Sequence, residues 1–172
     1  LETQGGLAYL IISVTLYISG AGVPIPAEIP LLAAGWLLAE GDISLWGAVL
    51  AIGISLITGD LTAYWLGRRF GERIWSVPPF RWVLTEKRLA WVKRHFHEHQ
   101  GKAIFFSRFL AGIRLVSFVF AGMVRVNVLK FVALDMLAAA LSAPIFVIVA
   151  YVVKTRFGDD IQMAFKYARR IQ

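Results

Sequence analysis

The chain has 172 residues, of which 58% are hydrophobic and 17% charged, and its mean hydropathy is +0.67. Soluble domains are about 45–50% apolar, so this composition argues against a soluble domain and predicts one integral membrane domain over residues 1–172. The net charge of +7 would suggest nucleic-acid binding in a soluble protein, but the basic residues here lie beside aromatic ones, as at a membrane surface. The absence of cysteine excludes disulfides, thiol catalysis and cysteine-ligated metal.

The first apolar stretch is interrupted by prolines. Residues 7–23 carry no charge, whereas residues 29–39 are apolar but number only 11, and a membrane-spanning helix needs about 20. Pro24, Pro26 and Pro30 lie where the two runs meet, and each proline removes a backbone donor and clashes with the preceding helical turn. We therefore predict a re-entrant hairpin, in which two half-helices meet at a proline-rich tip inside the membrane. Such broken backbone needs protein or a water-filled cavity around it.

Two later stretches are better candidates for complete membrane spans. Residues 45–67 form a run of 23 with a single charge, Asp60. Residues 129–153 form another, which contains Asp135 near its start and Pro144 in its middle. Both are long enough to cross the hydrocarbon core of a bilayer as helices.

Residues 103–126 repeat the interrupted pattern. This apolar stretch contains Arg108 and Arg114, with Gly112 between them. A glycine can adopt backbone conformations that end a helix, so Gly112 is the expected hinge. We predict a second re-entrant hairpin here, again a pair of half-helices that meet inside the membrane.

Two basic segments bear on the topology. Residues 68–102 hold nine of the 18 lysines and arginines together with several aromatic residues, so we predict an amphipathic helical segment along the cytoplasmic face. Residues 159–172 are expected to form a short basic amphipathic helix at the surface. The positive-inside rule places both segments on one side, but a single span between them would separate them. Either residues 103–126 cross fully, or the charge of the tail is not a topology signal, which is the interpretation we favour.

The chain also resembles itself at an offset of 87 residues. Residues 22–74 aligned without a gap to residues 109–161 give 11 identities in 53 pairs, and Ala34-Gly35 falls on Ala121-Gly122. Each unit would contain one hairpin and one span. An odd number of crossings would turn the second unit upside down, which is the inverted-repeat plan of many transporters. The predicted fold is therefore an all-α membrane protein built from two inverted units.

Charged residues at membrane depth are the main functional clue, because each one costs several kcal/mol to insert. They are Glu28, Asp60, Arg108, Arg114 and Asp135. One interpretation is that they form structural salt bridges or lie near an interface, and this alternative is strongest for Asp135. The other is that they form a site for a substrate or a proton.

The two arginines suit an anionic substrate. On an unbroken helix their six-residue separation would point them about 240° apart, but a break at Gly112 would let Arg108 and Arg114 converge. Two converging guanidinium groups can present bidentate forks to a phosphate or a carboxylate. A half-helix N-terminus at the hairpin tip would add N–H donors to the same anion.

The acidic residues have two possible roles. Glu28 directly follows the Pro24-Ile25-Pro26 tip, where a carboxylate in a low dielectric is a plausible proton carrier. Asp60 and Asp135 could act in the same way or could only balance the charge of the arginines.

A metal site and a hydrolase site are the weaker interpretations. His95 and His99 are spaced i,i+4, a spacing that can bind zinc on a helix, but no third ligand has a suitable position, and an exposed polar helix face is favoured. No serine shows a nucleophile-and-base arrangement. We therefore expect no metal, no cofactor and no enzymatic activity.

Three sequence elements together resemble the DedA family, whose relatives include the VTT-domain membrane proteins of eukaryotes. They are Gly22-Val23-Pro24-Ile25-Pro26-Ala27-Glu28, the Gly59-Asp60 element followed by Tyr64 and Gly67, and Phe106-Ser107-Arg108-Phe109 followed by Gly112, Arg114 and Ala121-Gly122. The match extends over about residues 15–160. Many members carry a further acid shortly before the Pro-x-Pro tip, at the position of Ser19 here.

The resemblance implies two facing re-entrant hairpins in a multi-pass protein of the cytoplasmic membrane, and transport of lipids across that membrane. The implied substrate in bacteria is undecaprenyl phosphate, with proton coupling, whereas the eukaryotic relatives scramble phospholipids. Arg108, Arg114 and Glu28 match positions that the family needs. A transporter for protons or small ions and a non-transporting membrane scaffold are the alternatives from other classes.

Overall fold

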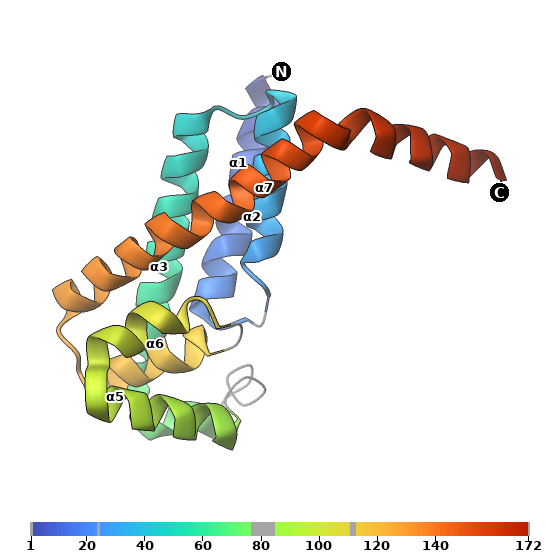
Figure 1. Cartoon of the computed structure of the whole chain (residues 1–172). Helices are drawn as coiled ribbons and strands as arrows, with labels where there is room; N and C mark the ends of the chain where they lie inside the picture. The colour runs from blue at the N-terminus through green and yellow to red at the C-terminus, as the bar shows by residue number, and fades with distance from the viewer. Residues whose placement is uncertain (1, 24, 77–84, 111–112, 172) are drawn as a thin grey trace.

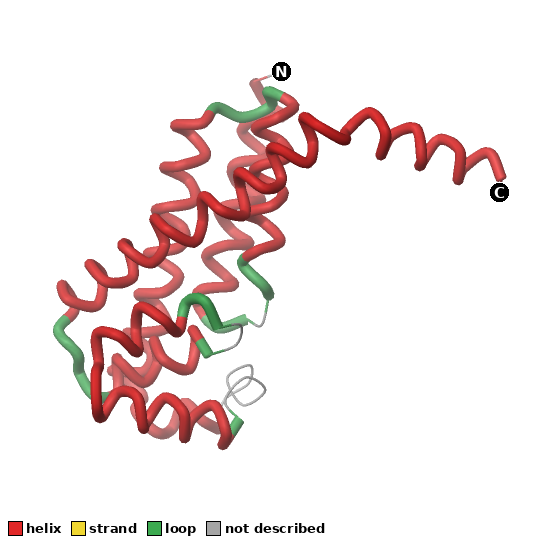
Figure 2. Tube along the Cα trace, viewed as in Figure 1, coloured by secondary structure: helices red, strands yellow, loops and turns green. Residues whose placement is uncertain are grey.

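Every element in the described part of the chain is helical. The computed structural model describes residues 2–23, 25–76, 85–110 and 113–171 (Figures 1 and 2). The elements are α1 (Glu2–Ala21), α2 (Glu28–Glu40), α3 (Leu45–Phe70), the 3-10 helix η1 (Gly71–Ser76), α5 (Glu86–Ser107), α6 (Arg114–Met123) and α7 (Val128–Ile171). The predicted all-α class is confirmed. The predicted tip residue Pro24 and the predicted hinge Gly112 lie outside the described residues.

Two of the described helices are long and apolar enough to cross a membrane. They are α3, with 26 residues, and residues Val128–Gly158 of α7, with 31. These contain the predicted spans 45–67 and 129–153, and Pro144 lies inside α7 without ending it. Large apolar side chains cover their outer faces, and Trp46 and Leu129 are 77% and 79% exposed. Lipid is the solvent that suits such a surface.

The first apolar stretch is broken where the prolines predict. Helix α1 ends at Ala21 and α2 begins at Glu28, and the two helices run side by side in opposite directions (Figure 1). Gly22 turns the chain with a φ of 130°, and the Ser19 hydroxyl donates to the Ile25 carbonyl at 2.6 Å. With 13 residues, α2 rises about 20 Å, less than the roughly 30 Å of a bilayer core.

The second apolar stretch is also broken. Helix α5 ends at Ser107 and the ten-residue α6 begins at Arg114. The connection from α6 to α7 passes through Arg125, which has a φ of 54°, and the Asn127 side chain accepts the Leu129 backbone N–H at 2.9 Å to start α7. Neither predicted hairpin is therefore one straight helix.

The predicted interfacial segment 68–102 is not one helix. It comprises the end of α3, η1, residues 77–84, which are outside the described set, and most of α5. Helix α5 buries Val92 and Phe96 against the core while Lys93 and Arg94 are exposed, so this part is amphipathic as predicted. Its backbone departs from helical geometry at His99.

The C-terminal tail differs from the prediction. Residues 159–171 are a continuation of α7 rather than a separate short helix, because Gly158 alone does not end the helix. The tail extends away from the other helices at the end of the molecule opposite α5 (Figure 1). The two basic segments therefore lie at opposite ends of the structure.

Two apolar cores lie one above the other. The first joins the C-terminal half of α3 with α5, α6 and the start of α7, and includes Ala63 and Phe131. The second joins α1, α2, the N-terminal half of α3 and the middle of α7, and includes Leu56 and Ala139. Asp60 on α3 and Asp135 on α7 are both buried at the boundary between these cores.

Glycines let the helices approach until their backbones touch. A Cβ added to Gly122 would collide with the Tyr64 carbonyl oxygen, and one added to Gly67 would collide with that of Val119, so α6 and α3 pack in direct backbone contact. On the other side of α3, a Cβ on Gly59 would lie 2.7 Å from the Tyr17 carbonyl oxygen of α1. Small residues at such crossings are typical of helices that pack within a membrane.

Candidate functional site

The candidate site is the layer of charge between the two apolar cores. Asp60 comes from the middle of α3 and Asp135 from the first third of α7, and their side chains are 0% and 2% exposed. Arg108 directly follows α5, and Arg114 is the first residue of α6. The segment between α5 and α6 thus supplies both cations, while the two helices that are long enough to cross a membrane supply the acids.

Asp60 is the acceptor that joins the two arginines. Arg114 donates to Asp60 Oδ1 from Nε at 3.1 Å and from Nη2 at 2.5 Å. Arg108 Nη1 donates to Asp60 Oδ2 at 3.0 Å and also to Asp135 Oδ1. Charge-assisted hydrogen bonds of this kind are about twice as strong as neutral ones, so the four side chains form one connected network.

Glu28 lies at the edge of this network. It is the first residue of α2, where the helix dipole favours a negative charge, and it lies within electrostatic range of Arg114. It is partly buried, and no described residue hydrogen-bonds to its side chain. The three acids and two arginines give the group a formal charge of −1, so phosphate binding would require a proton or the displacement of a carboxylate.

The arginines nevertheless keep unused donors. Among the described residues, Nε and Nη2 of Arg108 and Nη1 of Arg114 have no hydrogen-bond partner. In the described structure, Ser117 Oγ is the one fully buried side-chain polar atom that has no hydrogen-bond partner. The unpaired arginine nitrogens are therefore not fully buried. Arg114 is the more open of the two arginines, with a side chain that is 16% exposed against 4% for Arg108.

Sequence reasoning gave no role to Ser117. This residue is completely buried in α6, and its Oγ has no partner among the described residues. It lies three residues after Arg114, and residues spaced i,i+3 occupy neighbouring positions on a helix. The spacing from Arg114 is therefore a signal for Ser117 that is present in the sequence. An isolated serine in an apolar helix nevertheless gives no reason to select it as a site residue.

The backbone at the histidine segment is not one regular helix. His99 has non-helical φ and ψ angles of −151° and 80°, so His95 and His99 are not successive turns of one regular helix. The described residues contain no group of three or more potential metal-ligating side chains.

A comparison with known families identifies the family of the chain. A family model described as the VTT domain matches residues 25–155, which is most of the chain and includes all five charged residues of the site. The chain belongs to the VTT-domain (DedA) family. The resemblance noted from the sequence motifs is thereby confirmed. No solved structure matches the chain.

The VTT-domain relatives are membrane proteins. An uncharacterized membrane protein of Haemophilus influenzae is 34% identical over 142 residues, covering 81% of this chain and 67% of the relative. One from Synechocystis is 31% identical over 134 residues, covering 78% and 62%. A Bacillus subtilis protein named undecaprenyl phosphate transporter A is 29% identical over 148 residues, covering 86% and 74%. The chain thus spans less than two thirds of the Synechocystis relative, and the activity of a whole relative does not pass to it directly.

Proposed function

We propose that this protein moves a phosphorylated lipid across the cytoplasmic membrane and that Arg108 and Arg114 bind the lipid phosphate. The observation that carries the proposal is that both arginines converge on Asp60 inside an apolar protein while retaining unpaired N–H donors. A phosphate needs several donors in a fixed arrangement, and guanidinium forks provide them. The name of the Bacillus subtilis relative supports undecaprenyl phosphate as the substrate.

The broken helices would give the phosphate a route through the membrane. We propose that α1–α2 and the segment from the end of α5 to α6 are re-entrant hairpins in inverted units, as the 87-residue offset and the shortness of α2 and α6 suggest. Interrupted helices surround midplane sites in many transporters. Their ends would keep polar backbone beside a headgroup that cannot cross hydrocarbon unaided.

Protons would release and reset the site. Asp60 and Asp135 share one guanidinium nitrogen of Arg108, so a proton on either carboxylate would free donors for the phosphate. Glu28 has no hydrogen bond to a described residue, so a proton on this acid would break none of the hydrogen bonds that join the arginines to Asp60 and Asp135. We therefore propose that Glu28 carries the coupling proton and that Asp60 and Asp135 balance charge.

The test compares lysine substitutions at the site with one outside it. Purified variants Arg108→Lys, Arg114→Lys and the control Arg69→Lys, which changes an exposed residue at the end of α3, are titrated with polyprenyl phosphate. Lysine keeps the charge but lacks the planar fork, so both site variants should lose about tenfold or more in affinity, which corresponds to about 1.4 kcal/mol. Unchanged affinity in both would make the arginines structural and favour a membrane scaffold.

A second experiment separates lipid transport from proton or small-ion transport. Glu28→Gln should preserve binding of polyprenyl phosphate while reducing the pH dependence of its flux. A proton flux through the wild-type protein that needs no lipid substrate would instead support an ion-linked transporter.

A further inference from the structure

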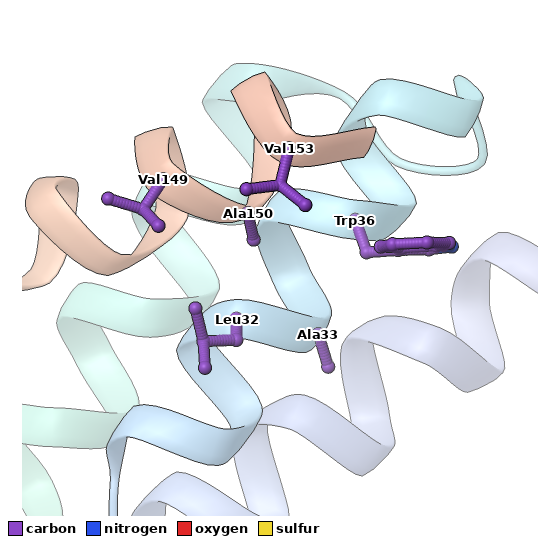
Figure 3. Close-up of a pocket in the computed structure, with 6 residues that line it drawn as sticks. All are labelled: Leu32, Ala33, Trp36, Val149, Ala150 and Val153. Atoms are coloured by element: carbon purple, nitrogen blue, oxygen red, sulfur yellow. The ribbon is translucent and has the colours of Figure 1, made fainter. Parts of the chain in front are cut away.

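A groove between α2 and α7 is a feature that the charged site does not use. It has a volume of about 380 Å³ and is lined by Leu32, Ala33 and Trp36 of α2 and by Val149, Ala150 and Val153 of α7. Figure 3 shows these six side chains on the two neighbouring helices. The volume is within the range of about 300–1,000 Å³ of small-ligand sites. Val149, the first groove residue on α7, lies about 21 Å along the helix from Asp135. The groove is therefore separate from the charged site.

One of the two close glycine contacts between α6 and α3 has no counterpart between α2 and α7, the helices that border the groove. Gly35 brings α2 against the Val147 backbone of α7, much as Gly122 brings α6 against α3. The contact between α6 and α3 continues at Gly67, but the 87-residue offset places Lys154 at the corresponding position in α7. A long side chain cannot occupy the space of a glycine, so Lys154 cannot make the second close contact that Gly67 makes.

The end of the groove carries a matched pair of charges. Lys154 Nζ lies 2.9 Å from Glu40 Oε1 and 4.5 Å from the centre of the Trp36 ring, and Trp36 Nε1 donates to the same Glu40 oxygen at 3.2 Å. Both Lys154 contacts fix the cation at the groove mouth. The Glu40 side chain remains 36% exposed, and no described residue donates to its Oε2.

The residues of the turn after Glu40 are typical of a membrane surface. Gly41, Asp42 and Ser44 interrupt the apolar sequence between α2 and α3, and all three are exposed. Trp46, on the next turn, is also exposed, as tryptophans in the interfacial belt are. An apolar groove directly below an interface meets the acyl chains of the bilayer, not water.

We propose that the groove binds one acyl chain of a phospholipid with a primary-amine headgroup, whose ammonium donates to Glu40 and whose phosphate accepts from Lys154. A zwitterionic headgroup complements a cation and an anion held side by side, whereas an anionic headgroup would meet the Glu40 carboxylate. The hydrogen bond from Lys154 holds the pKa of Glu40 below its ordinary value, so the carboxylate is charged at neutral pH. The binding does not depend on the proposed transport function.

Fluorescence quenching by brominated lipids tests the proposal in the full-length chain. A variant that keeps Trp36 and replaces the other five tryptophans by phenylalanine is reconstituted in vesicles. Acyl-brominated phosphatidylethanolamine, phosphatidylcholine and phosphatidylglycerol are added at equal mole fractions in separate samples. An exposed ion pair contributes about 0.2–1 kcal/mol, so the ethanolamine lipid should show a preference of up to about fivefold. A variant that keeps only Trp46, at the same end but outside the groove, should show none.

Two substitutions assign the binding to the groove and the headgroup contact. Ala33→Phe puts a ring into the groove from an exposed position and should reduce Trp36 quenching to that seen for Trp46. Glu40→Gln should keep the quenching but remove the headgroup preference, whereas Asp42→Asn, which changes an exposed acid outside the groove, should keep both. Equal quenching of Trp36 by all three lipids, a preference for phosphatidylglycerol, or no effect of Ala33→Phe would overturn the proposal.

Discussion

Neutralising Asp60 should destabilise this protein more than any other single conservative change to the charged site. The Asp60 carboxylate has no exposed surface and accepts three hydrogen bonds from two guanidinium groups, at 2.5 to 3.1 Å. Asp60→Asn keeps the shape of the side chain and removes its charge. Arg114 then has no hydrogen-bonded acid among the described residues, and Arg108 keeps only Asp135.

The size of the effect follows from the burial. Removing one partner of a buried ion pair costs about 3–5 kcal/mol, because the remaining charge is left uncompensated. For a chain of this length, 1 kcal/mol shifts Tm by about 2–4 °C. Asp60→Asn should therefore lower Tm by about 6–20 °C.

The assay is thermal unfolding of purified protein in detergent, with Asp42→Asn as the control, since Asp42 is exposed. The control should shift Tm by no more than about 2 °C, because exposed substitutions usually change stability by less than about 0.5 kcal/mol. The double variant Asp60→Asn/Arg114→Gln removes the cation as well and should recover part of the loss. An Asp60→Asn decrease in Tm no larger than that of Asp42→Asn would refute the charge network as described. A double variant whose decrease in Tm exceeds the sum of the decreases of its two single variants would also refute it.

Three smaller predictions concern packing, pH and the first turn. Gly122→Ala should lower Tm markedly, because its Cβ would collide with the α3 backbone, whereas Gly53→Ala, with nothing within 4 Å of the added Cβ, should leave Tm unchanged or raise it. The ion pair of Glu40 with Lys154 lowers the pKa of Glu40 from 4.5, so its stabilisation is present above about pH 4.5 and is lost as the pH falls further; the Tm difference between wild type and Glu40→Gln should disappear in acid. Ser19→Ala removes the hydroxyl that holds the turn before α2 and should increase proteolytic cleavage there without lowering polyprenyl phosphate affinity.

The helix boundaries were largely predictable because they depend on local chemistry. Proline cannot continue a helix, so the break after Ala21 follows from the residues themselves. The long apolar helices α3 and α7 follow from uninterrupted apolar length. The non-helical backbone at His99 and the continuation of α7 beyond Gly158 were not predicted, since neither position contains a residue that decides the conformation.

The composition of the charged site was predictable, but its pairing was not. Burial at membrane depth is costly for any charge, so five such residues in an apolar chain indicate a common site. Which acid joins the arginines depends on how α3 packs against the segment from α5 to α6. Asp60 is 48 positions from Arg108 and 54 positions from Arg114 in the sequence. A local sequence pattern does not predict contacts between residues so far apart. The sequence therefore left two possible roles for Asp60.

The most direct test of the central claim is transbilayer flux of polyprenyl phosphate in liposomes that contain the purified protein. The account predicts protein-dependent flux of polyprenyl phosphate, no acceleration of the phosphate-free polyprenol, and loss of the flux in Arg114→Lys but not in Arg69→Lys. Equal flux of polyprenyl phosphate and polyprenol, or full flux in Arg114→Lys, would show that the arginines do not recognise the phosphate.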